Sequence, residues 1–338
     1  MHRQEKQIFA DKEDLKMFDF YIVTAVLNAV DTIDRTVWSI LSQRGDVHIH
    51  YHVQDAGSTD GTLEKLEAWQ RRLTSCSVLP AKISFSLASE PDSGLYEGIQ
   101  RGFERLEIPE KAFMAYLNSD DVLFPGAVQT VAQVARDLPD VDWLYGWRGL
   151  MDQWGRIVHT NVLDVDFPRS LIAEGLAESI HHHHIMQETT VWRKRLYDKA
   201  GGLDTTRFAG DWDLWRRFAK HSEMVHLRAN IGAFCRRPGQ LSGDLGRYTA
   251  DIDKAIPRDV RKSKMMDIIK NKDSLAITVS DLDTDGRWKL RLKKEIRFRS
   301  EVIKSLAPSG AEPSVSLTPF ELPWWRRLIK NPRRCSFW

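Results

Sequence analysis

Cysteine is scarce in this sequence, and no hydrophobic run is long enough to cross a membrane. The three cysteines, Cys76, Cys235 and Cys335, are odd in number and far apart, so they predict neither a disulfide framework nor a zinc site and favour a reducing compartment. No apolar run approaches the ~18 residues that span a bilayer. Residues 1–17 alternate in charge and lack the apolar centre of a secretory signal. These absences predict a cytoplasmic protein.

An excess of charge of one sign is also missing. The 338 residues include 49 Lys and Arg against 47 Asp and Glu, so the bulk charge does not indicate a nucleic-acid partner. Hydrophobic residues make up 42% and charged residues 28%, which is typical of a globular protein with a substantial core. The sequence has no Gly-x-Gly-x-x-Gly after its first apolar run and no Walker lysine, so dinucleotide-binding and P-loop proteins lose support.

Short apolar runs alternate with helical patterns along the first 140 residues. Strands are predicted at residues 21–27, 48–54, 83–88 and 112–117, and helices at residues 33–41, 62–73 and 95–106, with another helix opening near Pro125. This alternation predicts an α/β fold, with a mainly parallel sheet and helices on both faces. In such sheets, ligands bind at the carboxyl ends of the strands.

The rest of the chain divides by composition. The pattern after residue 142 is more mixed, with strands predicted at 143–151 and 189–192 and a helix at 211–219; after residue 247 charges dominate. Four prolines, at 308, 313, 319 and 323, indicate a linker. We therefore expect an α/β domain at residues 18–245, a charged helical extension at 246–306, and a linker with a basic aromatic tail at 307–338.

Acidic residues follow the predicted strands where a ligand site is expected. Asp120 and Asp121 are adjacent in a turn, which is costly unless a positive group compensates them. Mg²⁺ provides such a charge and takes one or two carboxylates plus phosphate oxygens, although the pair also suits the capping of the next helix. Asp55 opens a turn of small residues, where a ligand can approach the backbone and a carboxylate can accept hydrogen bonds from a base or ribose. Both interpretations of the acidic pair stay open.

Five motifs occur in a fixed order over residues 20–243. They are Thr24-Ala-Val-Leu-Asn28 with residues 36–43, the Asp-Ala-Gly-Ser-Thr-Asp-Gly-Thr of residues 55–62, the Ser-Glu-Pro-Asp-Ser-Gly-Leu-Tyr-Glu of residues 89–97, Leu117-Asn-Ser-Asp-Asp121, and Gly210-Asp-Trp-Asp-Leu-Trp215. The ordered set resembles the inverting glycosyltransferases of family 2, and most closely members that act in exopolysaccharide or lipopolysaccharide assembly. The resemblance implies a GT-A fold and transfer of one hexosyl or N-acetylhexosaminyl group from a nucleotide diphosphate sugar to an acceptor hydroxyl.

The resemblance also implies donor and metal residues. Asp121 corresponds to the metal ligand and Asp120 to the ribose-side or second acid, which is also a candidate metal ligand, with Mn²⁺ or Mg²⁺ as the cofactor. The implied donor-binding residues are Ala25, Asn28, Asp55, Asp92 and Asp120. Two positions depart from the common pattern, because Ala56 replaces a second acid and Asn118 replaces an aspartate.

On the other side of the reacting bond, the resemblance implies a base and an acceptor surface. The base corresponds to Asp211, with Asp213 as the fallback, and the acceptor side to His184, Gln187 and Trp212. For Trp212, stacking on a sugar and packing in the core are both open interpretations. The run of four histidines at residues 181–184 is open to a metal-site interpretation, but the resemblance favours an acceptor loop.

Two other functions stay open beside glycosyl transfer. One is a GT-A-fold subunit that has lost turnover and acts by binding in glycan assembly, which the intact Asp120, Asp121 and Asp211 argue against. The other is a nucleotidyltransferase on a similar sheet. We expect a glycan or lipid-linked acceptor and no nucleic acid.

The carboxyl-terminal tail suggests contact with a membrane surface. Residues 323–338 include five Lys or Arg and no acid, together with aromatic rings at Trp324, Trp325, Phe337 and Trp338. Aromatic rings favour the bilayer interface, and basic residues are attracted to anionic headgroups. Peripheral attachment at the inner face of the membrane is therefore predicted, with packing of the tryptophans on the main domain as the alternative.

Overall fold

The computed structural model describes residues 17–75, 79–160, 165–240, 243–270 and 275–294, and the backbone of 297–299 and 318–320. The predicted membrane-contacting residues of the tail, and nearly all of the predicted linker, lie outside these ranges. Within them, no helix combines the length and the hydrophobicity that a membrane crossing requires.

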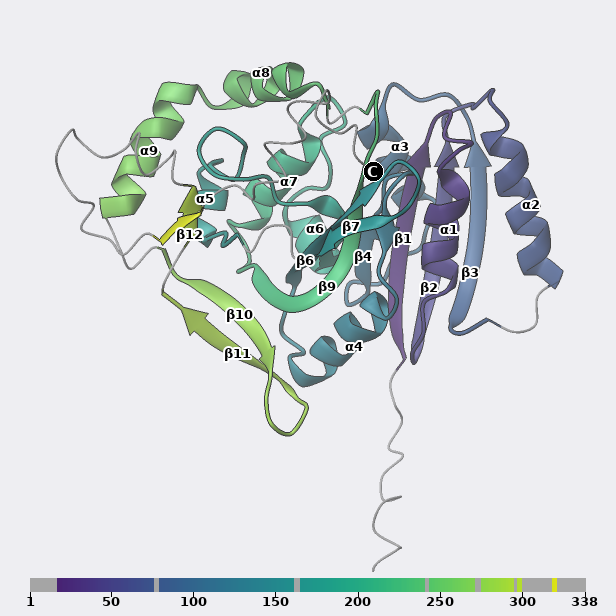
Figure 1. Ribbon diagram of the computed structural model, residues 1–338, viewed down its shortest axis with the longest axis horizontal. Helices are drawn as coiled ribbons and strands as arrows, with labels where there is room; N and C mark the ends of the chain where they lie inside the picture. The colour runs from purple at the N-terminus through teal and green to yellow at the C-terminus, as the bar shows by residue number, and fades with distance from the viewer. Residues whose placement is uncertain are drawn as a thin grey trace, which may run out of the picture.

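One mixed sheet forms the centre of the molecule (Figure 1). Its main path has the order β11-β10-β9-β6-β8-β4-β1-β2-β3. The strands are β1 (Phe18–Val26), β2 (Val47–Asp55), β3 (Lys82–Ser89), β4 (Phe113–Tyr116), β6 (Trp143–Asp152), β8 (Thr190–Arg193), β9 (Val225–Arg236), β10 (Ile277–Leu282) and β11 (Trp288–Lys293), with β5 (Val122–Leu123) on β9 and β7 (Ile157–Thr160) on β6. The strands β4-β1-β2-β3 are parallel, and β8 runs antiparallel to both β4 and β6.

Helices cover both faces of this sheet, which confirms the predicted α/β fold. They are α1 (Ile33–Leu41), α2 (Thr62–Ser75), α3 (Leu95–Glu104), α4 (Ala127–Asp137), α5 (Arg169–Ala173), α6 (Lys194–Lys199), α7 (Gly210–Phe218), α8 (Leu245–Ala255) and α9 (Arg258–Lys270), with a short 3₁₀ helix, η1 (Gln187–Thr189). Alternate residues of β1 supply two cores. Ile22 packs with α1 and α4, whereas Val23 packs on the opposite face with α3 and α7.

The extension after residue 245 is not helical throughout, which corrects the prediction for residues 246–306. After α8 and α9, β10 pairs in parallel with β9, and β11 returns antiparallel to β10. A short parallel pair, β12 (Arg297–Arg299) and β13 (Thr318–Phe320), follows. In β11, Trp288, Leu290 and Leu292 alternate with basic residues, which is the period of two typical of a strand. Because the segment is highly charged, this strand was not predicted from the sequence. Trp288 is buried against α4, and its backbone N–H donates to Asp137, so β11 extends the main sheet.

Candidate active site

The carboxyl ends of β1, β2 and β4 meet at one edge of the sheet, at the top of Figure 1. Asp55 is the last residue of β2 and is fully buried. One of its carboxylate oxygens accepts hydrogen bonds from the backbone N–H groups of Gly57 and Ser58, both at 3.0 Å, and from the hydroxyl of Ser89 at 2.6 Å. Asp55 therefore holds the turn after β2 in shape and joins it to the end of β3.

The loop after β1 is tied to the same turn. Asn28 has a φ of 52°, in the left-handed region that few residues other than glycine adopt. Its side-chain oxygen accepts from the backbone N–H of Thr59 at 2.9 Å, and its own N–H donates to Ser58 at 2.8 Å. Asp60 accepts from the N–H of Val30 and from that of Thr62, the first residue of α2. The two loops thus form one platform beside the strand ends.

Asp92 and Ala25 lie on the α3 side of this platform. Asp92 accepts from the N–H of Gly94 at 2.9 Å, one turn before α3. Burial raises the pKa of Asp92, and the negative charges of Glu97 and Asp55 raise it further, although the Gly94 hydrogen bond opposes them. Ala25 is buried beside Asp92, where both pack against Gly98 of α3. The predicted donor residues of β1, β2 and the β3–α3 loop are therefore neighbours.

Asp120 and Asp121 have different surroundings. Asp121 is fully buried, and N–H donors reach both of its carboxylate oxygens. One oxygen accepts from the backbone N–H of Cys235 at 2.8 Å; the other accepts from Gln187 at 3.0 Å and Asn118 at 3.2 Å. Burial raises the pKa of Asp121 well above its usual value, and the neighbouring Asp120 and Glu188 add to this rise. Asp121 thus connects three separate segments of the chain.

The carboxylate of Asp120 faces a basic side chain. Its Oδ2 accepts from Nε of Arg237 at 2.7 Å and from Nε2 of Gln240 at 3.1 Å, both from the segment after β9. Among the described residues, no donor reaches Oδ1 of Asp120. The guanidinium of Arg237 and the carboxylate of Asp120 form an ion pair.

Asp211 is held in a fixed orientation at the start of α7. Its Oδ1 accepts from the hydroxyl of Tyr96 at 2.9 Å, the hydroxyl of Tyr248 at 2.8 Å and the N–H of Trp212 at 2.8 Å. Within the described residues no donor reaches Oδ2, and the residue is only half-buried. A β-carbon at Gly210 would lie 2.8 Å from the Tyr96 ring, so glycine at this position lets Tyr96 approach Asp211. Neither tyrosine was singled out from the sequence.

The fallback base, Asp213, has both oxygens occupied. One accepts from Arg216 at 2.9 Å and the other from Arg217 at 2.8 Å, and the side chain is only 7% exposed. Burial alone would raise the pKa of Asp213, but the hydrogen bonds from the two arginines outweigh it and hold the pKa below its usual value. Of the two acids in this motif, Asp211 is therefore open to a ligand, whereas Asp213 is paired with arginines of its own helix.

Of the predicted acceptor-side residues, His184 and Gln187 lie beside the acids. The ring of His184 packs edge-on against Tyr248, with centroids 4.9 Å apart, and Gln187 donates to Asp121. Trp212 is 3% exposed and donates to the carbonyl of Gly175, so core packing describes it and its ring has no face free for a sugar.

Two other histidines of the run bind to the protein itself. His181 pairs with Glu178, and His182 contacts the carbonyl of Asp166 at 2.5 Å. Among the described residues, no three ligand atoms of this run lie close enough together to hold one ion.

Glu188 is a buried acid that sequence reasoning missed. It follows Gln187 in η1, is 3% exposed, and its Oε1 has no hydrogen-bond partner among the described residues. Burial raises the pKa of Glu188 to about 7; Arg148 opposes the rise, whereas Asp211 and Asp120 add to it. Glu188 is adjacent in the sequence to Gln187, a predicted acceptor-side residue, and this position was the signal that could have identified it. Asp120, Asp121, Glu188 and Asp211 thus form one cluster of acids.

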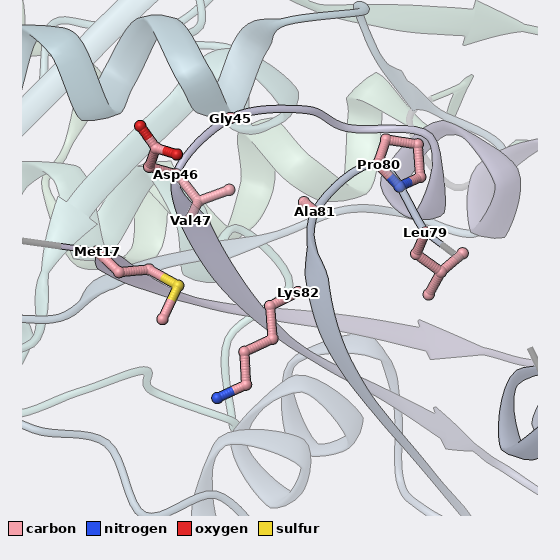
Figure 2. Close-up of a pocket in the computed structure, with 8 residues that line it drawn as sticks. All are labelled: Met17, Gly45, Asp46, Val47, Leu79, Pro80, Ala81 and Lys82. Atoms are coloured by element: carbon pink, nitrogen blue, oxygen red, sulfur yellow. The ribbon is translucent and has the colours of Figure 1, made fainter. Parts of the chain in front are cut away.

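An open hollow of about 430 Å³ lies at the other ends of the strands and is not part of this cluster. Figure 2 shows its eight lining residues, which come from the segments entering β1, β2 and β3. The acidic cluster itself contains no group of three metal-ligating side chains among the described residues, so a cation there would need further oxygens from a ligand.

Comparison with known proteins gives a family and a fold. A family model described as glycosyl transferase family 2 matches residues 21–199, which is more than half of the chain. The crystal structure of S. aureus TarS 1–349 in complex with UDP-GlcNAc superposes with a TM-score of 0.50 at 14% identity, covering 75% of this chain and 67% of that chain. No curated protein matches the sequence.

Two other solved structures are less similar. The same TarS fragment in complex with UDP gives a TM-score of 0.46 at 14% identity, covering 76% of this chain and 72% of that one. The mannosyltransferase PcManGT from Pyrobaculum calidifontis, in complex with GDP-Man and Mn²⁺, gives 0.40 at 17% identity, covering 73% and 64%. Both TM-scores are below 0.5, so neither structure adds support for the fold.

Glu188 predicts a specific pH dependence of stability. Because its pKa is about 7 in the folded protein against an ordinary 4.5, the folded state holds the proton longer as the pH rises. The free energy of unfolding therefore falls as the pH rises from about 4.5 to about 7. Glu188→Gln should remove this fall and raise the free energy of unfolding by on the order of 1–3 kcal/mol at pH 8, with little effect at pH 4. Urea unfolding at both pH values measures the difference, and an equal effect at the two would contradict the assignment.

Proposed function

This chain belongs to glycosyl transferase family 2 and has the GT-A fold, and from this premise we propose that it moves one sugar, with inversion, from a nucleotide diphosphate sugar to an acceptor hydroxyl. The proposal rests mainly on one observation, the pairing of an oriented half-buried carboxylate, Asp211, with the Asp120–Arg237 pair in the same acidic cluster. Asp211 is suited to remove a proton from an acceptor hydroxyl. The Asp120–Arg237 pair is suited to hold the diphosphate leaving group.

The donor is proposed to bind on the platform formed by the loops after β1 and β2. Asp55, Asp92, Ala25 and Asn28 line the ends of neighbouring strands, where ligands of parallel sheets bind. Asn28 and Asp60 lock the loops together, so the platform is shaped before the donor arrives. A UDP-GlcNAc donor is named for TarS. By analogy we propose a hexosyl or N-acetylhexosaminyl nucleotide as the donor class, without choosing a base.

Asp120 fits the role of metal ligand better than Asp121. No donor from the described part of the chain reaches its Oδ1, and Mg²⁺ and Mn²⁺ accept one carboxylate oxygen together with phosphate oxygens. Asp121 has both oxygens occupied by N–H groups. When bound, the divalent cation would neutralise charge on the departing diphosphate. Arg237 supplies a positive charge of the protein's own at the same place, and Gln240 steadies the carboxylate between them.

Asp211 is proposed as the base. Two tyrosine hydroxyls and a backbone N–H fix its Oδ1, so its Oδ2 points in one direction and is ready to accept a proton from an acceptor hydroxyl. Burial and the Asp211 carboxylate raise the pKa of both Tyr96 and Tyr248 well above the ordinary value, which keeps these hydroxyls protonated as donors. Gln187 and His184 flank the place where an acceptor would lie. A glycan or lipid-linked acceptor of surface polysaccharide or glycolipid assembly is proposed.

Replacing the two adjacent acids should separate metal binding from folding. Asp120→Asn should abolish the Mn²⁺-dependent rise in melting temperature that a nucleoside diphosphate produces, because the ion loses its free carboxylate oxygen. Asp121→Asn should instead lower the free energy of unfolding by about 1–3 kcal/mol, since an amide leaves one N–H donor unsatisfied. Thermal-shift assays with UDP, GDP and other diphosphates, with and without Mn²⁺, measure the first effect. Loss of the metal-dependent shift in Asp121→Asn alone, with stability unchanged, would reverse the two roles.

Replacing the base should reduce turnover and leave donor binding intact. Asp211→Asn should lower transferase turnover by about 10² to 10⁴, the usual contribution of a positioned base. Asp213→Asn is the matched control two residues away, where the acid pairs with arginines and a loss of stability is expected instead. Product formation and donor affinity are measured for both variants. Full turnover in Asp211→Asn would move the base elsewhere.

A further inference from the structure

A group of two histidines and an aspartate lies at the amino-terminal ends of β1 and β2, far from the acidic cluster. His48, His50 and His52 alternate along β2, so their side chains lie on the same face of the sheet. Asp19 of β1 stands beside His48 in the strand register. Seven residues of extended strand separate His48 from Asp55, which corresponds to about 23 Å. The group is therefore not part of the donor site.

Two of the three separations between ligand atoms are close to those of a tetrahedral metal site. Nδ1 of His48 is 3.5 Å from Oδ1 of Asp19, and Nε2 of His50 is 3.1 Å from the same oxygen. All three atoms lie within 4.8 Å of one another. Zn²⁺ binds nitrogen and oxygen at about 2.0–2.1 Å in a tetrahedron, whose edge is then about 3.3 Å. The two separations from Asp19 Oδ1, 3.5 Å and 3.1 Å, lie on either side of this edge length, so both histidine nitrogens are placed to share an ion with that oxygen.

Each imidazole is held in place by a neighbouring side chain. Nε2 of His48 lies 2.8 Å from the hydroxyl of Ser84 on β3, so a proton on Nε2 leaves the Nδ1 lone pair directed toward Asp19. Histidine ligands usually donate their second ring N–H in this way, which fixes the ring and its tautomer. His50 stacks on Tyr21, with centroids 4.2 Å apart and planes 3° from parallel. Both rings are therefore oriented before any ion binds.

The group is also accessible to an ion from solvent. One ring nitrogen of His48 and one of His50 approach the same carboxylate oxygen of Asp19, and a divalent cation can take all three atoms as ligands. Lys82 pairs with His48 in the register, but its side chain is exposed and can turn to solvent. The Asp19 side chain is 43% exposed, so an ion has access.

We propose that Asp19, His48 and His50 form a second cation site, which binds Zn²⁺ or a similar first-row divalent ion with a water in the fourth position. Imidazole and carboxylate ligands suit such ions. The site is distinct from the metal proposed at Asp120, because its ligands come from the opposite ends of the strands. A bound ion links the first residues of β1 to those of β2, beside the hollow of Figure 2, whose lining includes Val47 and Lys82.

The experiment is a titration of the tag-free full chain with Co²⁺ and Zn²⁺ after treatment with a chelator. Four-coordinate Co²⁺ has a characteristic visible spectrum, and Zn²⁺ should displace it. His50→Ala and Asp19→Asn should each remove this spectrum, and Ser84→Ala should weaken Zn²⁺ binding by about tenfold or more. Circular dichroism checks that each variant is folded, and Asp19→Asn keeps the shape of the side chain.

Two control variants locate the ion. His221→Ala removes an exposed histidine elsewhere and should leave the Co²⁺ spectrum unchanged. Asp120→Asn removes the ligand proposed for the donor site and should also leave it unchanged. The proposal is overturned if the wild type shows no four-coordinate Co²⁺ spectrum, or if His50→Ala and Asp19→Asn bind Co²⁺ and Zn²⁺ as the wild type does.

Discussion

The site depends on the burial of the Asp121 carboxylate. Its two oxygens join the strand end at Asn118, the 3₁₀ turn at Gln187 and the backbone of β9 at Cys235, while its own carbonyl accepts from Thr36 of α1. A buried carboxylate is tolerated only when donors surround it, so these segments can pack in few other ways. Glycine at position 232 is part of the same packing, because a β-carbon there would lie 2.1 Å from the carbonyl of Glu188.

This arrangement gives the acids of the cluster different tasks. Asp121 is used for structure, and its fixed position turns the neighbouring Asp120 toward Arg237 and the open edge of the sheet. Glu188 lies in the same 3₁₀ turn as Gln187 and is buried, and no donor among the residues that the structure describes reaches its Oε1. Asp211 approaches from α7, oriented by tyrosines of α3 and α8. Tyr248 lies beyond residue 245, so the first helix of the extension takes part in the site.

The local part of this structure could be predicted from the sequence, and the long-range part could not. Apolar residues spaced by two predicted β2, and apolar residues spaced by three or four predicted α1. The turn residues that follow β2 correctly predicted Asp55 at a strand end. One partner of Asp121 is Cys235, 114 residues away, and no local pattern reports that contact. For the same reason the resemblance pointed to Asp121 as the metal ligand, although donors from elsewhere in the chain occupy both of its carboxylate oxygens. β9 was missed because its buried residues are interrupted by exposed ones at a bulge against β6.

Glycosyl transfer requires that the bond between the sugar and the nucleoside diphosphate breaks, so that the nucleoside diphosphate leaves intact. In the proposed reaction, Asp120 and Arg237 lie beside this leaving group. A nucleotidyltransferase on a similar sheet would instead cleave a nucleoside triphosphate and release pyrophosphate. The most direct measurement is ³¹P NMR of the full-length protein with diamagnetic Mg²⁺ and a panel of nucleotide sugars and nucleoside triphosphates. The account predicts release of a nucleoside diphosphate from one of the sugars and no pyrophosphate. Pyrophosphate release, with every nucleotide sugar left intact, would contradict it.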